Sequence, residues 1–223
     1  MKNKIKTEFN WVVMGKCQVD VQYKTRRAVF LLLGLSVFMT CFIVVWLSNG
    51  FYDFVDYIGF NKTALHIPYA WGLALLVAVS YIVYTMRMIP LVRENIFNFS
   101  GCLKWIGVYA AFTGGLVEEL VFRQMLMSWL NAEGVNSCLQ VAMSGLVFGL
   151  VHFTWMCFGG NLYVGFCSVL STAVLGFLLA VVYLLAEYNV LPAVFAHIVI
   201  NIFVEPWLIL NATISQNKET SES

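Results

Sequence analysis

The feature that most limits how this chain can fold is a stretch of 53 residues, 134–186, that contains no Asp, Glu, Lys or Arg. One transmembrane helix needs about 20 residues, so this stretch is long enough for two helices joined by a turn. Charges are missing again over the 25 residues 28–52. Only 11% of the 223 residues are charged and 61% are hydrophobic, against about 25% and 45–50% in soluble domains. This composition excludes a cytosolic enzyme and predicts an all-α, polytopic membrane helix bundle.

Six transmembrane helices account for the apolar runs. We expect them, in chain order, at about 28–49, 68–89, 104–130, 138–158, 163–186 and 192–210. The expected turns before and after the fifth span are Gly159-Gly160-Asn161 and Glu187-Tyr188-Asn189. The chain then has four parts: a basic N-terminal segment at 1–27, two helices with their loops at 28–101, a core of about four helices at 102–210 and a polar tail at 211–223.

Lysine and arginine gather on one side of the expected spans. Seven of the 13 precede the first span, and three more (Arg87, Arg93 and Lys104) lie between the second and third spans. By the positive-inside rule the N-terminus is cytoplasmic, and six spans return the C-terminus to the same side. A net charge of only +1 excludes a nucleic-acid partner, and membrane lipids are the partner that this composition indicates.

A few ionisable side chains lie at membrane depth in the later spans: Glu118, Glu119, Arg123, His152 and His197. A charge kept at the centre of a bilayer costs about 2.5–3.5 kcal/mol on insertion scales, so each of these residues is a functional candidate. On a helix, Glu119 and Arg123 are four residues apart in the favourable order for an ion pair, whereas Glu118 is rotated by about 100°. We expect the pair to support the site and Glu118 to act as a general base.

Two further motifs place polar groups on other spans. Phe148 lies one helical turn before His152, where its ring can pack beside the imidazole, and Asn201 lies one turn after His197. Three helices therefore offer Glu118, one histidine, and a second histidine with an amide, and we expect these groups to form one site. Small residues let helices approach closely, and four glycines lie near the motifs: Gly114, Gly115, Gly145 and Gly149.

These motifs are E-E-x-x-x-R at 118–123, F-x-x-x-H at 148–152 and H-x-x-x-N at 197–201, and in this order they resemble the CPBP family. That family comprises the CAAX prenyl endopeptidases and related bacterial proteins linked to bacteriocin processing and self-immunity. The resemblance covers about residues 102–208. It implies an intramembrane endopeptidase that hydrolyses peptide bonds of a membrane-associated protein or peptide precursor.

The resemblance also implies roles for single residues. Glu118 would activate a water with help from His152, and His197 with Asn201 would form the oxyanion hole. The remaining motif residues, Glu119, Arg123 and Phe148, would support the site. Many relatives have glycine directly after the motif arginine, where this chain has Gln124. The short chain looks like a bacterial member, so we expect a multi-pass protein of the bacterial plasma membrane.

Alternatives to a metal-free protease remain open. Glu118, His152 and His197 are a potential ligand set for zinc. We favour catalysis without a cofactor, because zinc-bound histidines need second partners and few buried polar groups remain once Glu119 and Arg123 are paired. A non-enzymatic self-immunity or scaffold protein would bind a bacteriocin or peptide precursor through the same cavity. A proton-coupled transporter is disfavoured, because no pair of half-spans with inverted symmetry is apparent.

Overall fold

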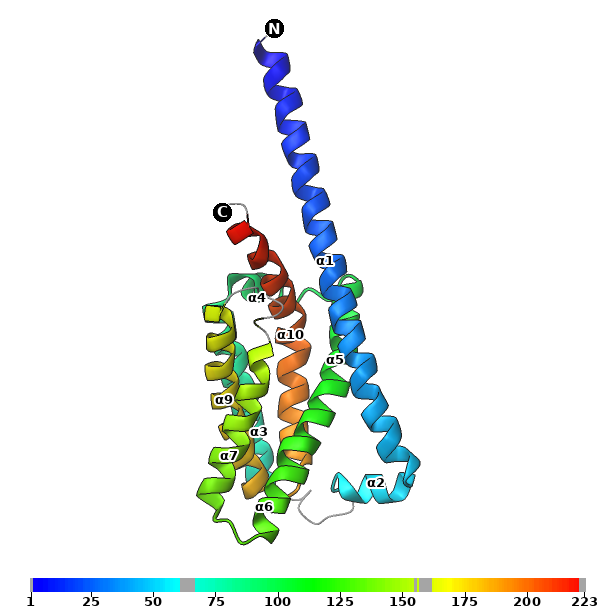
Figure 1. The fold of residues 1–223 in the computed structure, drawn as a ribbon, viewed down its shortest axis with the longest axis vertical. Coiled ribbons are helices and arrows are strands. Elements are labelled where there is room, and N and C mark those ends of the chain that lie inside the picture. The colour runs from blue at the N-terminus through cyan, green and yellow to red at the C-terminus, as the bar shows by residue number, and fades with distance from the viewer. Residues whose placement is uncertain (1, 61–66, 155, 157–161, 221–223) are drawn as a thin grey trace.

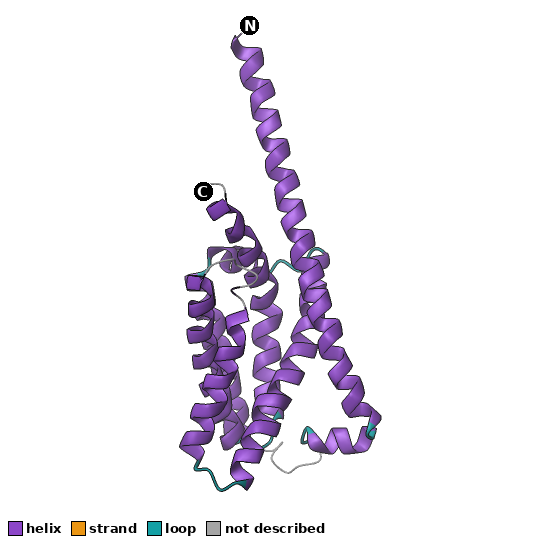
Figure 2. Cartoon of the chain, in the orientation of Figure 1, coloured by secondary structure: helices purple, strands orange, loops and turns teal. Residues whose placement is uncertain are grey.

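Six long apolar helices dominate the computed structural model, which describes residues 2–60, 67–154, 156 and 162–220, with side chains described over 25–60, 67–154, 156 and 162–214. Where the connections are described, short loops join the helices (Figure 2). The membrane spans are Thr25–Ser48, Pro68–Met88, Cys102–Ala132, Ser137–Thr154, Leu162–Leu185 and Leu191–Ile214. The prediction of an all-α bundle with six transmembrane helices is therefore confirmed, and the chain is an integral, multi-pass membrane protein.

The described residues form α-helices together with one π-helix (η2) and one short 3-10 helix (η3). In chain order the elements are α1 (Lys2–Ser48), α2 (Phe51–Tyr57), α3 (Pro68–Met88), α4 (Pro90–Asn95), α5 (Cys102–Glu119), η2 (Leu120–Met127), α6 (Ser128–Ala132), α7 (Ser137–Val151), η3 (His152–Thr154), α9 (Leu162–Leu185) and α10 (Leu191–Thr220).

Helix α10 occupies the middle of the bundle (Figure 1). It packs against α5 on one side and α3 on the other, while α1 packs on the outer side of α5 and α7 packs on α9. Both termini lie at the same end of the bundle, as six spans require (Figure 1). Three of the predicted glycine contacts are confirmed, because a Cβ on Gly115, Gly145 or Gly149 would meet Ile198, Phe177 or Ala173, respectively. Gly114 faces only the side chain of Glu118, so its predicted role in helix packing is wrong.

Helices extend further than the hydropathy pattern predicts. Helix α1 begins at Lys2, so residues 2–27 of the predicted basic segment are continuous with the first span. Helix α10 continues to Thr220, so residues 211–220 of the predicted tail are helical. Neither glycine nor proline occurs after Pro206, so no residue in this part of the chain stops the helix. The predicted turn at 159–161 lies outside the described residues.

The predicted turn at 187–189 is present between α9 and α10. Glu187 and Tyr188 adopt left-handed backbone conformations with φ of 53° and 61°. The buried Asn189 stabilises the turn, because its Oδ1 accepts from the Leu191 N–H at 2.9 Å and its Nδ2 donates to the Gly59 carbonyl at 3.0 Å. This side chain thereby connects the segment after α2 to the start of α10.

Candidate active site

The third span changes its helical form at the predicted acidic motif. Glu118 and Glu119 are the last two residues of α5, and the π-helix η2 follows directly. A π-helix has wider turns than an α-helix and occurs frequently at functional sites. Here it carries Arg123 and Gln124, and both side chains are buried. The helix thus changes from α to π directly after the two glutamates and before Arg123 and Gln124.

The predicted ion pair between Glu119 and Arg123 is confirmed. Arg123 Nε lies 3.1 Å from Glu119 Oε2, and both side chains are completely buried. The guanidinium also donates to the Gly176 carbonyl on α9 at 3.1 Å, and its Cζ lies 4.7 Å from the centre of the Phe148 ring on α7. Arg123 therefore connects η2 to two further helices and to the carboxylate that precedes it.

Glu119 does more than neutralise Arg123. Its second carboxylate oxygen, Oε1, lies 2.7 Å from His197 Nδ1 on α10. A carboxylate can only accept here, so His197 donates from Nδ1 and its ring orientation is fixed by this bond. Glu119 thus connects α5 to α10 and determines which nitrogen of His197 faces the site.

Glu118 faces both motif histidines. Its Oε2 lies 3.9 Å from His152 Nε2 and 3.8 Å from His197 Nε2. These distances are too long for direct hydrogen bonds and suit a water molecule between the groups. Glu118 Oε2 is buried and has no hydrogen-bond partner within the part of the chain that the structure describes. The structure therefore brings together three of the four predicted catalytic residues.

Each histidine makes a hydrogen bond through Nδ1, and this bond determines the role of its Nε2 beside Glu118. His152 Nδ1 lies 2.8 Å from the Phe148 carbonyl, which can only accept, so Nδ1 carries the proton. In the neutral ring His152 Nε2 is then an acceptor, and it faces the same space as the carboxylate oxygen of Glu118. These two acceptors bind a molecule that donates two hydrogens, and water is the simplest. His197 donates from Nδ1 to Glu119, so its Nε2 accepts in the neutral ring and donates when the ring carries both hydrogens.

Phe148 holds both imidazoles in place. Its ring is completely buried, and its centre lies 4.6 Å from that of His152 and 5.7 Å from that of His197. The predicted contact with His152 is confirmed, and the contact with His197 adds a second one. Phe122 packs edge-on against the same ring at 5.2 Å. The aromatic cluster excludes water from one side of the site.

The next two polar residues of α10 extend the site along one face of the helix. Asn201 is partly buried and forms no hydrogen bond within the described residues, so its amide is free to donate. Glu205 follows one turn later, and its Oε2 is buried without a hydrogen-bond partner there. It is close enough to interact electrostatically with Glu118 and His197. Sequence reasoning did not assign Glu205 to the site, although the spacing 197, 201, 205 places it on the same helical face.

The expectation that the two histidines lack second partners is wrong. Both histidines have second partners, namely Glu119 for His197 and the Phe148 carbonyl for His152. The distances between the three groups differ from those of a zinc site. Ligand atoms about 2.0–2.1 Å from a tetrahedral zinc lie about 3.3 Å apart, which is shorter than the separations of 3.8 and 3.9 Å from Glu118. No group of three or more His, Cys, Asp or Glu residues in the described ranges is arranged to hold a metal ion.

Gln124, which departs from the pattern of the resembling family, has its own partner. Its Oε1 accepts a hydrogen bond from the Tyr183 hydroxyl on α9 at 3.1 Å, and that hydroxyl also lies 2.9 Å from Ser128 Oγ. The glutamine therefore forms a buried polar contact between η2 and α9.

We expect Tyr183→Phe to lower the free energy of unfolding by about 1–3 kcal/mol, because it leaves buried polar groups without a partner. The measurement is denaturant unfolding in detergent, with Tyr84→Phe as the matched control. Tyr84 is exposed, and its hydroxyl makes no hydrogen bond among the described residues. Equal stability of the two variants would contradict the role of this contact.

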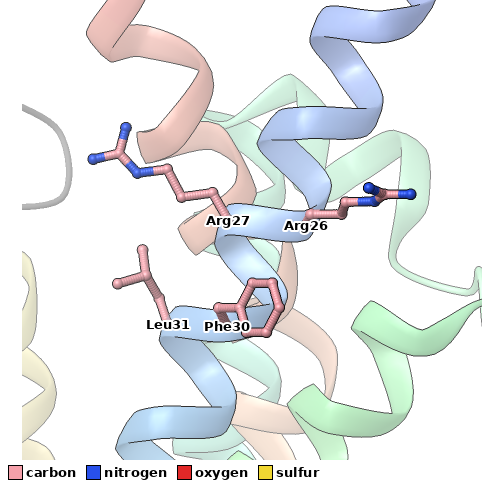
Figure 3. Close-up of a pocket in the computed structure, with 4 residues that line it drawn as sticks. All are labelled: Arg26, Arg27, Phe30 and Leu31. Carbon is pink, nitrogen blue, oxygen red and sulfur yellow. The ribbon is translucent and has the colours of Figure 1, made fainter.

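A separate hollow of about 400 Å³ lies beside the middle of α1, where the first span begins. Arg26, Arg27, Phe30 and Leu31 line it, and the two arginines project in opposite directions from the helix (Figure 3). None of the site residues lines this hollow, so it is unrelated to the polar cluster.

A family model matches the part of the chain that contains the four predicted catalytic residues. Residues 101–203 match the family model of the type II CAAX prenyl endopeptidase Rce1-like proteins. This range includes Glu118, His152, His197 and Asn201. No match was found among curated proteins or among solved structures. The chain therefore carries, at residues 101–203, a domain of the Rce1-like type II CAAX prenyl endopeptidase family.

Proposed function

We propose that the chain is an intramembrane endopeptidase that hydrolyses a peptide bond of a membrane-associated protein or peptide precursor. The observation that carries the proposal is the convergence of Glu118 Oε2 and two imidazole nitrogens at 3.8 and 3.9 Å. This is a binding site for water inside a domain of a protease family. We place the protein in a bacterial plasma membrane by its resemblance to the bacterial members of the family. We place the N-terminus in the cytoplasm, because most lysines and arginines lie on that side.

Glu118 and His152 act on the water in this scheme. The water donates one hydrogen to Glu118 and the other to His152 Nε2, and Glu118 takes the proton as the oxygen attacks the substrate carbonyl. The attack forms one C–O bond and moves the carbonyl electron pair to oxygen. Collapse of this tetrahedral intermediate breaks the C–N bond. The proton held by Glu118 then passes to the leaving amine.

His197 and Asn201 stabilise the negative oxygen of the intermediate. Asn201 has a free amide, and His197 donates from Nε2 when both ring nitrogens carry hydrogens. The buried carboxylate of Glu119 lies 2.7 Å from Nδ1 and fixes the ring orientation that points Nε2 into the site. Donors held in place before the reaction contribute most in a site that excludes water. Glu119 and Arg123 are therefore positioning residues for the oxyanion hole.

The proposal is tested with purified protein in lipid vesicles. We offer two probes of identical sequence, a farnesylated peptide ending in a C-a-a-X motif and the same peptide without the prenyl group, together with a pool of hydrophobic leader peptides. Cleavage of any probe by the wild-type chain, detected as new termini by mass spectrometry, supports the protease. Cleavage that persists in Glu118→Ala or His152→Ala would contradict the assigned residues.

We expect the activity to survive a strong chelator, because the site residues as arranged do not fit a zinc ion. The measurement compares the initial rates of protein dialysed with and without chelator, and both rates should agree within about twofold. Loss of hydrolysis with the chelator and its recovery on addition of zinc would show that Glu118, His152 and His197 rearrange to bind a metal.

A further inference from the structure

Lys104 is a buried cation that the proposed mechanism does not use. Its side chain is completely buried near the start of α5, and it has no ion-pair partner among the residues whose side chains are described. The sequence suggested a loop cation that sets the topology. Instead, Nζ donates to the Ile202 carbonyl on α10 at 2.6 Å. Three aromatic rings surround the ammonium, and their centres lie 4.5, 5.4 and 5.8 Å from Nζ for Phe99, Phe203 and Trp207.

The acceptor of this bond is unusual. In an α-helix the Ile202 carbonyl would accept from the N–H of residue 206, but residue 206 is a proline inside α10 and has no N–H. The carbonyl is therefore left without its helical donor. Burial of an unpaired carbonyl is costly, and it is more costly in a membrane, where no water can replace the partner. Lys104 supplies the missing donor from the neighbouring helix.

The proline also fixes where the two helices meet. A Cβ on Gly107 would collide with the Pro206 ring, so α5 and α10 approach closely at this point. Along the same contact Gly115 meets Ile198, and Glu119 meets His197. Later residues of α5 thus pair with earlier residues of α10, and the two helices are antiparallel neighbours (Figure 1).

Ile202 directly follows Asn201 and lies between it and Glu205. We propose that Lys104 is a positioning residue: its bond to the carbonyl freed by Pro206 holds the turn of α10 that carries Asn201 and Glu205 against α5. The role in catalysis rests on the proposed function, whereas the contact itself does not. A shift of about 1 Å at a reacting group is enough to reduce catalysis about 100-fold, so loss of this bond should affect the chemical step.

The test is a double-mutant cycle. Lys104→Met keeps a long apolar side chain among the three rings but removes the donor. We expect it to lower kcat about 10- to 100-fold with KM changed by less than about threefold. Pro206→Ala restores an N–H at residue 206, which can bond to the Ile202 carbonyl. In the Pro206→Ala background, Lys104→Met should therefore change kcat by less than about threefold. Equal losses in both backgrounds would overturn the proposal.

The melting temperatures of the same four proteins are measured as a second readout. Lys104→Met should lower it in the wild-type background and leave it nearly unchanged in the Pro206→Ala background. The melting temperature tests the bond between Lys104 and the Ile202 carbonyl even where a variant is too inactive for kinetics. It does not depend on whether the wild type cleaves the probe. Arg93→Met, which removes an exposed cation from α4, is the matched control and should change neither kcat nor melting temperature. A melting temperature that falls equally in both backgrounds contradicts the bond to Ile202.

Discussion

Replacing Glu118 by glutamine should reduce the rate of peptide hydrolysis by about 10²- to 10⁴-fold, the usual contribution of a general base. Glutamine has the shape of glutamate but cannot take a proton from water. The fold should tolerate the change, because Glu118 Oε2 has no hydrogen-bond partner within the described residues. Initial rates with the peptide probes, and the melting temperature of the variant, check both statements.

Glu133→Gln is the matched control for this prediction. Glu133 is an exposed residue that follows α6, and the whole of α7 separates it from His152. We expect its substitution to leave the rate unchanged. Hydrolysis that persists at the wild-type rate in Glu118→Gln would show that Glu118 is not the base. Binding of a peptide that survives the substitution, without hydrolysis by the wild type, would favour the non-enzymatic partner.

Replacing Arg123 by methionine should lower the free energy of unfolding by about 3–5 kcal/mol. Removing one member of a buried ion pair leaves the other charge without compensation, and Glu119 is completely buried. The substitution also removes the donor to the Gly176 carbonyl. Denaturant unfolding in detergent measures the effect.

A second substitution separates charge from packing in this prediction. Glu119→Gln removes the negative charge but keeps an oxygen that accepts from His197, so the double variant with Arg123→Met should recover part of the lost stability. Arg87→Met, which removes an exposed arginine from α3, should have little effect. Equal destabilisation by Arg123→Met and Arg87→Met would contradict the importance of the buried pair.

Local patterns in the sequence predicted the membrane spans and the contacts between residues one helical turn apart. Runs without charge locate the six spans, because a bilayer rejects ionised side chains over about 20 residues. Spacings of four residues predicted the pair of Glu119 with Arg123 and the contact of Phe148 with His152. These interactions lie within one turn of a helix, so the periodicity of the helix is enough to predict them.

Contacts between distant segments were not predictable in the same way. Arg123 bonds to the carbonyl of Gly176, and Lys104 to that of Ile202, and a backbone carbonyl has no signature in the sequence. Glu119 binds Arg123 and His197 at once, whereas spacing predicted only the former. The zinc argument had a wrong premise for this reason, because it counted side-chain partners and overlooked a second carboxylate bond and a backbone acceptor.

The most direct test of a protease that activates water with Glu118 is hydrolysis in water enriched in ¹⁸O. Membranes from cells that lack the chain are incubated with purified wild-type protein or with Glu118→Gln, and new peptide termini are identified by mass spectrometry. We expect new C-termini that carry ¹⁸O with the wild type, and their loss with Glu118→Gln. Membranes without new termini in either incubation, or with the same labelled termini in both, would contradict the proposed function.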